Sequence, residues 1–222
     1  MVTQPKITTL SAEYFGTAIL VLVVAGSGVM GEMLSPDNLA IALLTNSIAT
    51  GCGLYVLITL LMPISGAHFN PLVSVLVWRH DLTSKTFISY VTAQVTGAIS
   101  GLWLTHILFS LPILQYSEKA RHGFGIWASE FVSTLILLSV IYLGVKHNPG
   151  VESNKDKLPM LVAVCVTAGY WFTSSTFFAN PAVTIARSLT NTFVGIAPAD
   201  IAGFIVSQCL ALLLILFLTR KS

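Results

Sequence analysis

The sequence is dominated by six long apolar runs, and these constrain the fold more than any other feature. The runs cover residues 10–34, 39–62, 84–109, 124–145, 158–178 and 198–219. A helix needs about 20 mostly apolar residues to cross a bilayer, and in hydrocarbon it satisfies its own backbone hydrogen bonds. A closed barrel would instead show alternating strands of about ten residues. We therefore predict an all-α membrane protein with six transmembrane helices, forming a single domain over residues 1–222.

The composition excludes the soluble classes of protein. Of the 222 residues, 55% are hydrophobic and only 9% are charged, whereas a soluble domain carries about 25% charged residues. This excludes a soluble enzyme, a nucleic-acid-binding protein, a disulfide scaffold and a disordered chain. Cys52, Cys165 and Cys209 lie within apolar runs, so we interpret them as small core residues. The run at 10–34 is too long for the core of a signal peptide, and we expect it to be retained as a span.

The distribution of basic residues predicts the orientation in the membrane. Cytoplasmic loops carry an excess of Lys and Arg. If both termini are cytoplasmic, eight of the eleven bases lie inside, and only Lys119, Arg121 and Arg187 lie outside. The inside bases are Lys6, Arg79, Lys85, Lys146, Lys155, Lys157, Arg220 and Lys221. We therefore predict that both termini face the cytoplasm.

Two connections between spans are unusual. The segments at 63–78 and 174–194 are too apolar for aqueous loops and too short to span the bilayer, so we expect both to be re-entrant. Each contains an Asn-Pro pair, Asn70-Pro71 in the first and Asn180-Pro181 in the second. Asn is a favoured N-cap, and Pro is favoured at the first helical position. Each pair therefore predicts a short half-helix that begins inside the membrane.

The two halves of the chain resemble each other. The sequence SAEYFGT at 11–17 is echoed by ASEFVST at 128–134, the two Asn-Pro pairs correspond, and Gln94 corresponds to Gln208. Because each half has three spans, an odd number, the second copy must be inverted in the membrane. We predict inverted three-plus-three repeats over approximately 1–109 and 124–222. Such repeats place binding sites and pathways near the midplane, where the two half-helix N-termini would meet.

These features together resemble the major intrinsic protein family, the aquaporins and aquaglyceroporins. The resemblance covers the whole chain, including its length, its six spans, its paired Asn-Pro motifs and the acids Glu13 and Glu130 in the first and fourth spans. The run SGAHFNP at 65–71 is very close to the first signature of the family. The resemblance implies a homotetramer in the lipid bilayer, with a pore in each protomer that conducts water or small neutral solutes passively.

The half-helices and the resemblance together predict the chemistry of the pore midplane. A helix N-terminus carries about half a positive charge, so two N-termini that face each other would repel cations. An N-cap asparagine accepts hydrogen bonds through its oxygen, and we expect its side-chain N–H groups to stay free for the oxygen of a passing solute. The midplane residues are Asn70, Pro71, Leu72, Asn180, Pro181 and Ala182.

Three ionisable residues have more than one interpretation. Glu13 and Glu130 are functional candidates because they are ionisable residues within spans. Each can also hold the irregular backbone of a re-entrant loop, and the resemblance favours this bracing role. His68 lies two residues before Asn70, where it either lines the inner vestibule or bonds to the loop backbone.

The chain departs from the family at both motifs. The first motif reads Asn-Pro-Leu, so Leu72 adds bulk beside the first asparagine. Family members usually have an arginine after the second motif, where it forms an outer selectivity filter, but this chain has Val183. Such a filter should be wider, less polar and uncharged. By spacing from the asparagines, the other filter positions fall at Thr50, at Ala168 or Gly169, and at Phe177.

A filter of this kind favours solutes that have some apolar surface. We expect glycerol-like polyols, urea or neutral metalloid hydroxides such as arsenite. The run NPAVTIARS at 180–188 resembles a bacterial subgroup associated with arsenic resistance, which implies the bacterial inner membrane. Arg187 lies one turn beyond Val183. It either reaches back toward the filter from the outer mouth, because helical side chains tilt toward the N-terminus, or it bonds to loop carbonyls or the outer interface.

Two other functions compete with a passive channel. An ion-coupled secondary transporter also uses inverted repeats and broken helices, but it needs a midplane relay beyond the two glutamates. A non-conducting structural member of the family would result if Leu72 blocked the pore. We expect no enzymatic activity, cofactor, metal site or nucleic-acid partner, because no metal cluster or nucleophile–base pair converges in the sequence.

Overall fold

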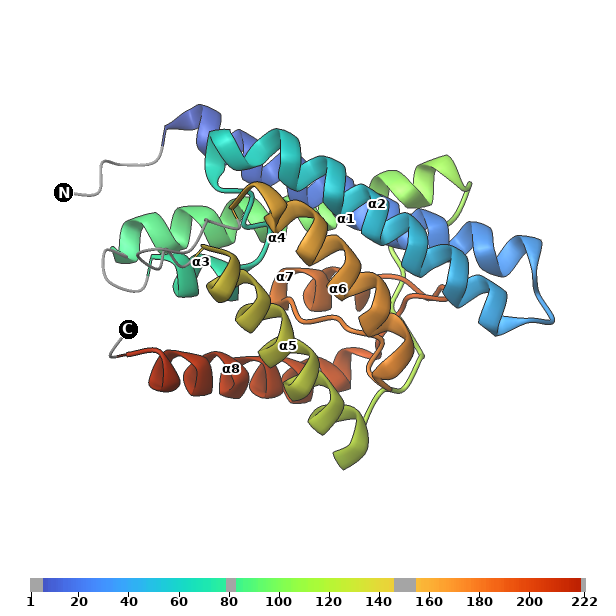
Figure 1. Cartoon of the computed structure of the whole chain (residues 1–222). Helices are drawn as coiled ribbons and strands as arrows, with labels where there is room; N and C mark the ends of the chain where they lie inside the picture. The colour runs from blue at the N-terminus through green and yellow to red at the C-terminus, as the bar shows by residue number, and fades with distance from the viewer. Residues whose placement is uncertain (1–5, 79–82, 146–154, 221–222) are drawn as a thin grey trace.

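The computed structural model describes residues 6–78, 83–145 and 155–220, and this part of the chain is helical with no strand. Arg79, Lys146 and Lys221, three of the bases that predict the orientation, lie outside the described residues. The α-helices of the described part, labelled in Figure 1, are α1 (Ile7–Leu34), α2 (Leu39–Ser65), α3 (Pro71–Val77), α4 (Ser84–Leu108), α5 (Phe124–Val145), α6 (Leu158–Phe172), α7 (Pro181–Arg187) and α8 (Ile201–Leu218). The 3₁₀ turns η1 (Lys155–Lys157) and η2 (Pro198–Asp200) precede α6 and α8. The predicted all-α class is confirmed.

Five helices of the described residues are long and apolar enough to cross a membrane, namely α1, α2, α4, α5 and α8 with its preceding turn. Their outward faces carry exposed aliphatic side chains, such as Ile48, Leu60 and Leu213. A soluble protein would bury these side chains, whereas lipid solvates them. The distribution of apolar surface therefore fits a bundle embedded in a bilayer.

The sixth predicted span is shorter than the sequence suggests. The apolar run continues to residue 178, but α6 has 15 residues and ends at Phe172. At about 1.5 Å per residue, this helix is shorter than the hydrocarbon core of about 30 Å. Residues 173–180 form a non-helical connection to α7 instead. The length of the predicted span therefore overestimated the length of this helix.

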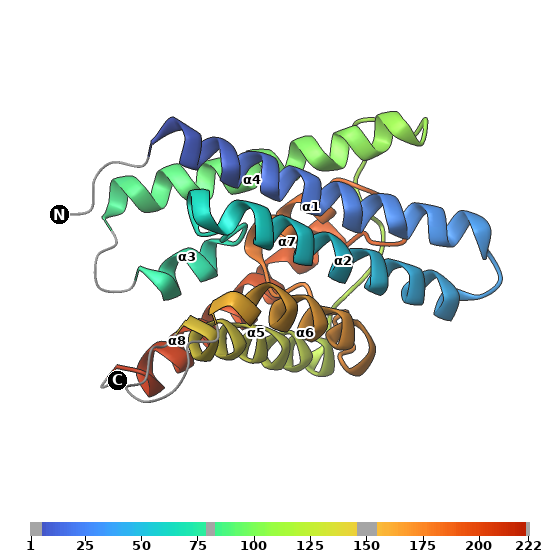
Figure 2. The same cartoon turned by 45° about the horizontal axis from the view of Figure 1, so that its top comes forward.

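The helices form two groups that enclose the half-helices. In one group α1 packs against α2 and α4, and in the other α5 packs against α6 and α8, while α2 and α6 join the groups. Figure 2 shows α1 and α4 above, α5, α6 and α8 below, and α7 in the interior. Both chain ends lie on the same side of the bundle in Figures 1 and 2. The short α3 and α7 contact helices of both groups.

Two glycines allow α1 and α4 to pack closely. A side chain at Gly97 would collide with the backbone carbonyl of Tyr14, and one at Gly101 would collide with that of Ala18. The sequence spacing of these glycines is typical of membrane helices that pack backbone to backbone. The α1–α4 contact therefore holds the wall of the bundle against which α7 also packs.

Candidate functional site

The half-helices begin at the Asn-Pro pairs, as the sequence predicts. Asn70 Oδ1 accepts a hydrogen bond from the backbone N–H of Leu72 at 2.9 Å, and Asn180 Oδ1 accepts one from Ala182 at 3.0 Å. In both cases the following proline occupies the first turn of the helix, where its missing N–H has no helical partner to lose. The caps start both helices inside the bundle rather than at its surface.

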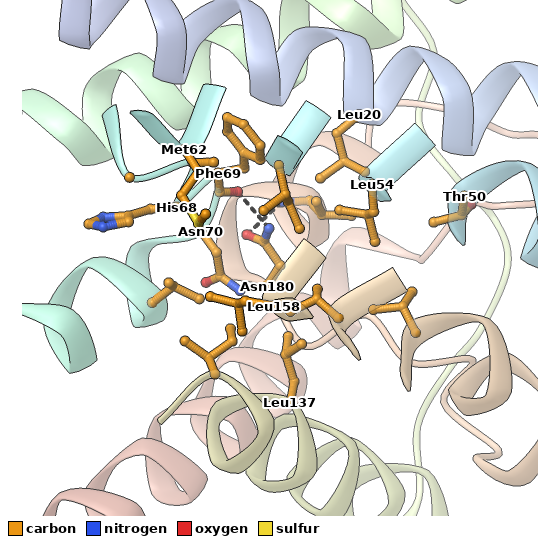
Figure 3. A pocket seen from close by; sticks show the side chains of 18 of the residues that line it. Leu20, Thr50, Leu54, Met62, His68, Phe69, Asn70, Leu137, Leu158 and Asn180 are labelled. Carbon is orange, nitrogen blue, oxygen red and sulfur yellow. Dashed lines mark hydrogen bonds between the residues drawn. The ribbon is translucent and has the colours of Figure 1, made fainter. Parts of the chain in front are cut away.

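The two asparagines also hold the opposite loop. Asn70 Nδ2 donates to the carbonyl of Ala179 at 2.7 Å, and Asn180 Nδ2 donates to the carbonyl of Phe69 at 2.8 Å. Figure 3 shows Asn180 and Phe69 joined in this way. An amide side chain has two N–H donors, so each asparagine keeps one that no described residue engages. The expectation that both donors would be free is corrected, because the loops use one of them to hold the half-helices together.

Glu13 braces the first loop. Its Oε1 accepts hydrogen bonds from Ser65 Oγ at 2.7 Å and from the backbone N–H of His68 at 2.9 Å. Its Oε2 accepts from the backbone N–H of Phe69 and from Gln94 Nε2, both at 2.8 Å. The loop needs this support because Phe69 has a φ of 50°, a left-handed conformation that is unfavourable for any residue with a side chain.

Glu130 has the equivalent place behind the second loop. Its Oε1 accepts from the backbone N–H of Ala179 at 2.6 Å and from Gln208 Nε2 at 2.7 Å. Ala179 has a φ of 47°, so the residue before each asparagine is left-handed. Gln208 Nε2 also donates to Thr184 Oγ1 on α7 at 3.0 Å, which ties the brace to the half-helix.

A cavity of about 420 Å³ passes both asparagines. In Figure 3, His68 lies toward one side, Thr50 toward the other, and Asn70 and Asn180 lie between them. Most of the lining is aliphatic, and among the described residues no Asp or Glu lines it. The polar side chains that line it are those of Thr50, His68, Asn70, Tyr170, Asn180 and Arg187. We call the part of the cavity at Thr50, Tyr170 and Arg187 the arginine end.

The rest of each Asn-Pro motif lies behind the cavity wall. Pro71, Leu72, Pro181 and Ala182 are buried but do not line the cavity. Leu72 is 4% exposed and packs in the main hydrophobic core. Its extra bulk therefore fills the core and leaves the cavity open.

At the arginine end, α2 and α6 contribute a pair of hydroxyl groups. Thr50 Oγ1 and the hydroxyl of Tyr170 lie 3.2 Å apart, and both residues are buried and line the cavity. Of the two positions expected from α6, Ala168 is exposed on the outer face, and Gly169 lies under the ring of Phe177, which a side chain at Gly169 would displace. Of these three consecutive positions, Tyr170 is the one whose side chain lines the cavity.

Tyr170 was missed because counting back from Asn180 assumes regular backbone. The connection instead contains three left-handed residues, Thr176, Phe177 and Ala179, which change how many residues fit between helix and asparagine. A tyrosine within an otherwise apolar run was the available signal, since a buried hydroxyl needs a polar neighbour. Phe177 and Val183 do line the cavity.

Arg187 lines the cavity and is only 2% exposed. Its Nε donates to the carbonyl of Val194, and its Cζ lies 3.4 Å from the centroid of the Phe178 ring, itself part of the lining. The two interpretations from the sequence therefore coexist, because the side chain bonds to a loop carbonyl and also contacts the cavity wall. Phe178 is a second lining residue that spacing did not predict.

His68 lines the cavity, and its imidazole bonds to a side chain of α3 rather than to the loop backbone. Its Nδ1 lies 3.0 Å from Ser74 Oγ on α3, and its backbone N–H is held by Glu13. Its ring packs against the rings of Trp78 and Tyr90, with centroids 4.7 and 5.4 Å away. The imidazole therefore has a fixed orientation at the wall.

Known proteins resemble this chain over much of its length. The sequence model of the family described as "Major intrinsic protein" matches residues 1–176. Aquaglyceroporin AqpS of Rhizobium meliloti (strain 1021) is 47% identical over 210 residues, which are 94% of this chain and 87% of that protein. An aquaglyceroporin of Toxoplasma gondii is 30% identical over 69% of this chain and 58% of its own length. The glycerol uptake facilitator protein of Pseudomonas aeruginosa is 32% identical over 48% of this chain and 38% of its own length.

Proposed function

The chain belongs to the major intrinsic protein family, and we propose that its pore is the cavity lined by Asn70 and Asn180 and admits solutes larger than water. The chain is an integral membrane protein, and its family forms passive channels for water and small neutral solutes rather than enzymes. We propose that the side chains lining the arginine end select among those solutes.

The observation that carries the proposal is the lining of the arginine end. Val183 occupies the wall one residue after the second Asn-Pro-Ala motif, where the family pattern has arginine. Thr50 and Phe177 occupy two other expected filter positions, and Tyr170 takes the place beside Gly169. A wall of this kind offers apolar contact, two hydroxyl groups and the guanidinium of Arg187 to a polyol. The expectation of an uncharged filter is therefore corrected, because Arg187 brings a cation into the lining. The names of the aquaglyceroporin and glycerol-facilitator relatives support the same class of solute.

Ions are excluded by the midplane. Asn70 and Asn180 cap the N-termini of α3 and α7. In the proposed pore these two N-termini approach the midplane from opposite directions, and each carries partial positive charge. Each asparagine offers its remaining N–H to a solute oxygen, which orients a passing water and interrupts a proton relay. Because no described Asp or Glu lines the cavity, nothing there offsets the barrier to cations.

An ion-coupled transporter is less well supported. Glu13 and Glu130 carry the hydrogen bonds of the two loops and lie behind the wall. A carboxylate that exchanges protons with the pore would have to release those bonds in each cycle. The glutamates therefore act as loop braces, and transport follows the solute gradient alone.

We also infer the arrangement of the chain in the membrane. Residues 1–109 and 124–222 form the inverted repeats, and the equivalent braces at Glu13 and Glu130 support this division. The excess of basic residues supports cytoplasmic termini, which places the arginine end outside. The bacterial relative AqpS supports a bacterial inner membrane, and the family resemblance supports a homotetramer.

Stopped-flow swelling of proteoliposomes tests the proposed pore. We expect the protein to raise permeability to glycerol as well as to water, because the filter is wide and lacks the arginine at position 183. Protein-free liposomes give the background. Permeation of water with no glycerol above background would show that the filter is narrow and would overturn the proposal.

A further inference from the structure

Two guanidinium groups meet at the arginine end. The Cζ of Arg187 lies 3.4 Å from the centroid of the Phe178 ring, and the Cζ of Arg121 lies 5.3 Å from the same centroid. The two cations therefore lie at most about 9 Å apart, the sum of these distances. Both are nearly buried, at 2% and 9% exposure, so water screens their repulsion weakly.

Neither guanidinium forms an ion pair with an acid of the described residues, although Glu130 lies near enough to attract both electrostatically. Among the described residues, His122 and Asp200 form an ion pair at 3.2 Å, and no ion pair includes Arg121 or Arg187. Asp200 accepts from the backbone N–H of Arg121, and Glu130 is held by its own loop. The arginine end thus carries two positive charges that no described carboxylate neutralises at contact distance.

Most of the hydrogen-bond donors of these groups are unused. Arginine has five N–H donors. Arg187 spends one, from Nε to the carbonyl of Val194, and Arg121 spends two, from Nε to Gly195 O at 2.8 Å and from Nη1 to Thr176 Oγ1 at 3.4 Å. No hydrogen bond to the described residues engages the Nη atoms of Arg187, and this residue lines the cavity.

The charged residues of the adjoining loop add to the positive charge at the arginine end. Burial lowers the pKa of Arg121 to about 10, which leaves it charged at neutral pH. The pKa of Lys119 is lowered by burial and by the nearby Arg121 and Arg187, while Glu32 opposes this effect. A third cation therefore adds to the positive field. Glu32 accepts from the backbone N–H of Phe193 and has no contact with either guanidinium.

We propose that the arginine end is a binding site for a small oxyanion, held by the Nη groups of Arg187 with Arg121 beside it. The planar fork of a guanidinium matches anionic oxygens better than a spherical ion. Thr50 and Tyr170 are hydrogen-bonded to each other, so one of the two hydroxyl groups keeps its O–H as a further donor on the same stretch of wall. A bound oxyanion neutralises the two cations and stands at the mouth of the proposed pore, so it slows solutes that enter from that side.

Binding is tested on the purified full-length protein in detergent, with inorganic phosphate as the probe. Phosphate should raise the thermal unfolding midpoint above that in sodium chloride of equal ionic strength, since a ligand of the native state stabilises it. Arg187→Gln should abolish this shift. Arg220→Gln is the matched control, because Arg220 also lies near an aromatic ring, at 5.2 Å from the Phe217 centroid, but is exposed and far along the chain from the site. A wild-type midpoint insensitive to phosphate, or an unchanged shift in Arg187→Gln, would overturn the site.

If Arg187→Gln does not fold, Arg187→Lys keeps the charge without the fork and should need about tenfold more phosphate for a half-maximal shift. An unchanged concentration dependence would contradict the proposal.

The effect on flux rests on the proposed function and is measured separately. External phosphate should slow glycerol swelling of wild-type proteoliposomes relative to chloride. Glycerol uptake with no response to phosphate in either assay leaves the channel proposal intact and refutes the anion site. A phosphate-dependent thermal shift in a protein that passes only water refutes the wide filter and leaves the site intact.

Discussion

At the scale of single residues, the site depends on two strained positions and the carboxylates that hold them. Phe69 and Ala179 have φ values of 50° and 47°, and each such conformation costs about 1–2 kcal/mol. The strain turns each carbonyl toward the opposite asparagine, so that the two half-helix caps exchange hydrogen bonds. The glutamates compensate by accepting the N–H groups of the same two residues.

Glu13→Gln should therefore destabilise the protein strongly. An amide has one acceptor oxygen in place of two, and its NH₂ would face the N–H donors of the loop. We expect a loss of about 2–4 kcal/mol in the free energy of unfolding, measured by denaturation in mixed micelles. The exposed Glu118 is the control, and Glu118→Gln should change stability by less than about 0.5 kcal/mol. Equal effects of the two substitutions would show that Glu13 is not a brace.

Val183→Arg should shift selectivity toward water. A guanidinium at this wall position narrows the arginine end and adds donors that replace the hydration of water better than that of a polyol. We expect glycerol permeability to fall by about tenfold or more while water permeability falls less, as measured by swelling. Val183→Thr, which keeps the size of the side chain, should retain glycerol uptake. If Val183→Arg keeps the wild-type ratio, Val183 does not belong to the filter.

At the scale of helices, close packing and a short helix position the site. The α1–α4 contact depends on Gly97 and Gly101, and α6 ends at Phe172 early enough for the chain to turn into the bundle. A longer α6 would leave too few residues to reach Asn180. Residues 173–178 are four hydroxyl-bearing residues followed by Phe177 and Phe178, and the two aromatic side chains are buried inside the bundle.

Gly101→Ala should disrupt this packing. The added methyl group would collide with the backbone carbonyl of Ala18, which cannot move without the helix. We expect a loss of about 1–3 kcal/mol, seen as a lower unfolding midpoint. Gly125 on α5 is the matched control, since a side chain there meets no atom within 4 Å. Gly125→Ala should be neutral or stabilising, and a similar loss at both glycines would mean that the α1–α4 approach is not limiting.

At the scale of the whole molecule, the helices pack in two groups that correspond to the two halves of the chain. Each half-helix packs on helices of both groups, so neither half can complete the cavity alone. The cavity is bordered by positive half-helix termini and by Arg187, while the acids lie behind its wall. Because no Asp or Glu of the described residues lines the cavity, we expect the pore to oppose cations and to pass solutes without proton coupling.

A proton gradient should therefore leave the distribution of glycerol unchanged. Proteoliposomes loaded with labelled glycerol at equal concentrations on both sides should show no net movement when the external pH is lowered. Proteoliposomes that contain a pore former large enough to admit sucrose serve as the leaky control for vesicle integrity. Net accumulation that collapses with a protonophore would demonstrate coupling and contradict passive transport.

The sequence by itself determined the membrane class, the approximate positions of five of the six spans, both half-helix starts and the two candidate acids, because apolar length, Asn-Pro caps and isolated acids are local signals. Only the tertiary structure decided which side chains reach the cavity. The left-handed residues of the connection after α6 affect which of its neighbours, Tyr170 and Phe178, reach the cavity. A loop distant in sequence brings Arg121 to the arginine end, and Leu72 turns into the core. The physical reason is that irregular backbone has no fixed repeat, so spacing along the chain does not set the direction of a side chain. The donors left to the two asparagines likewise depend on carbonyls more than a hundred residues away.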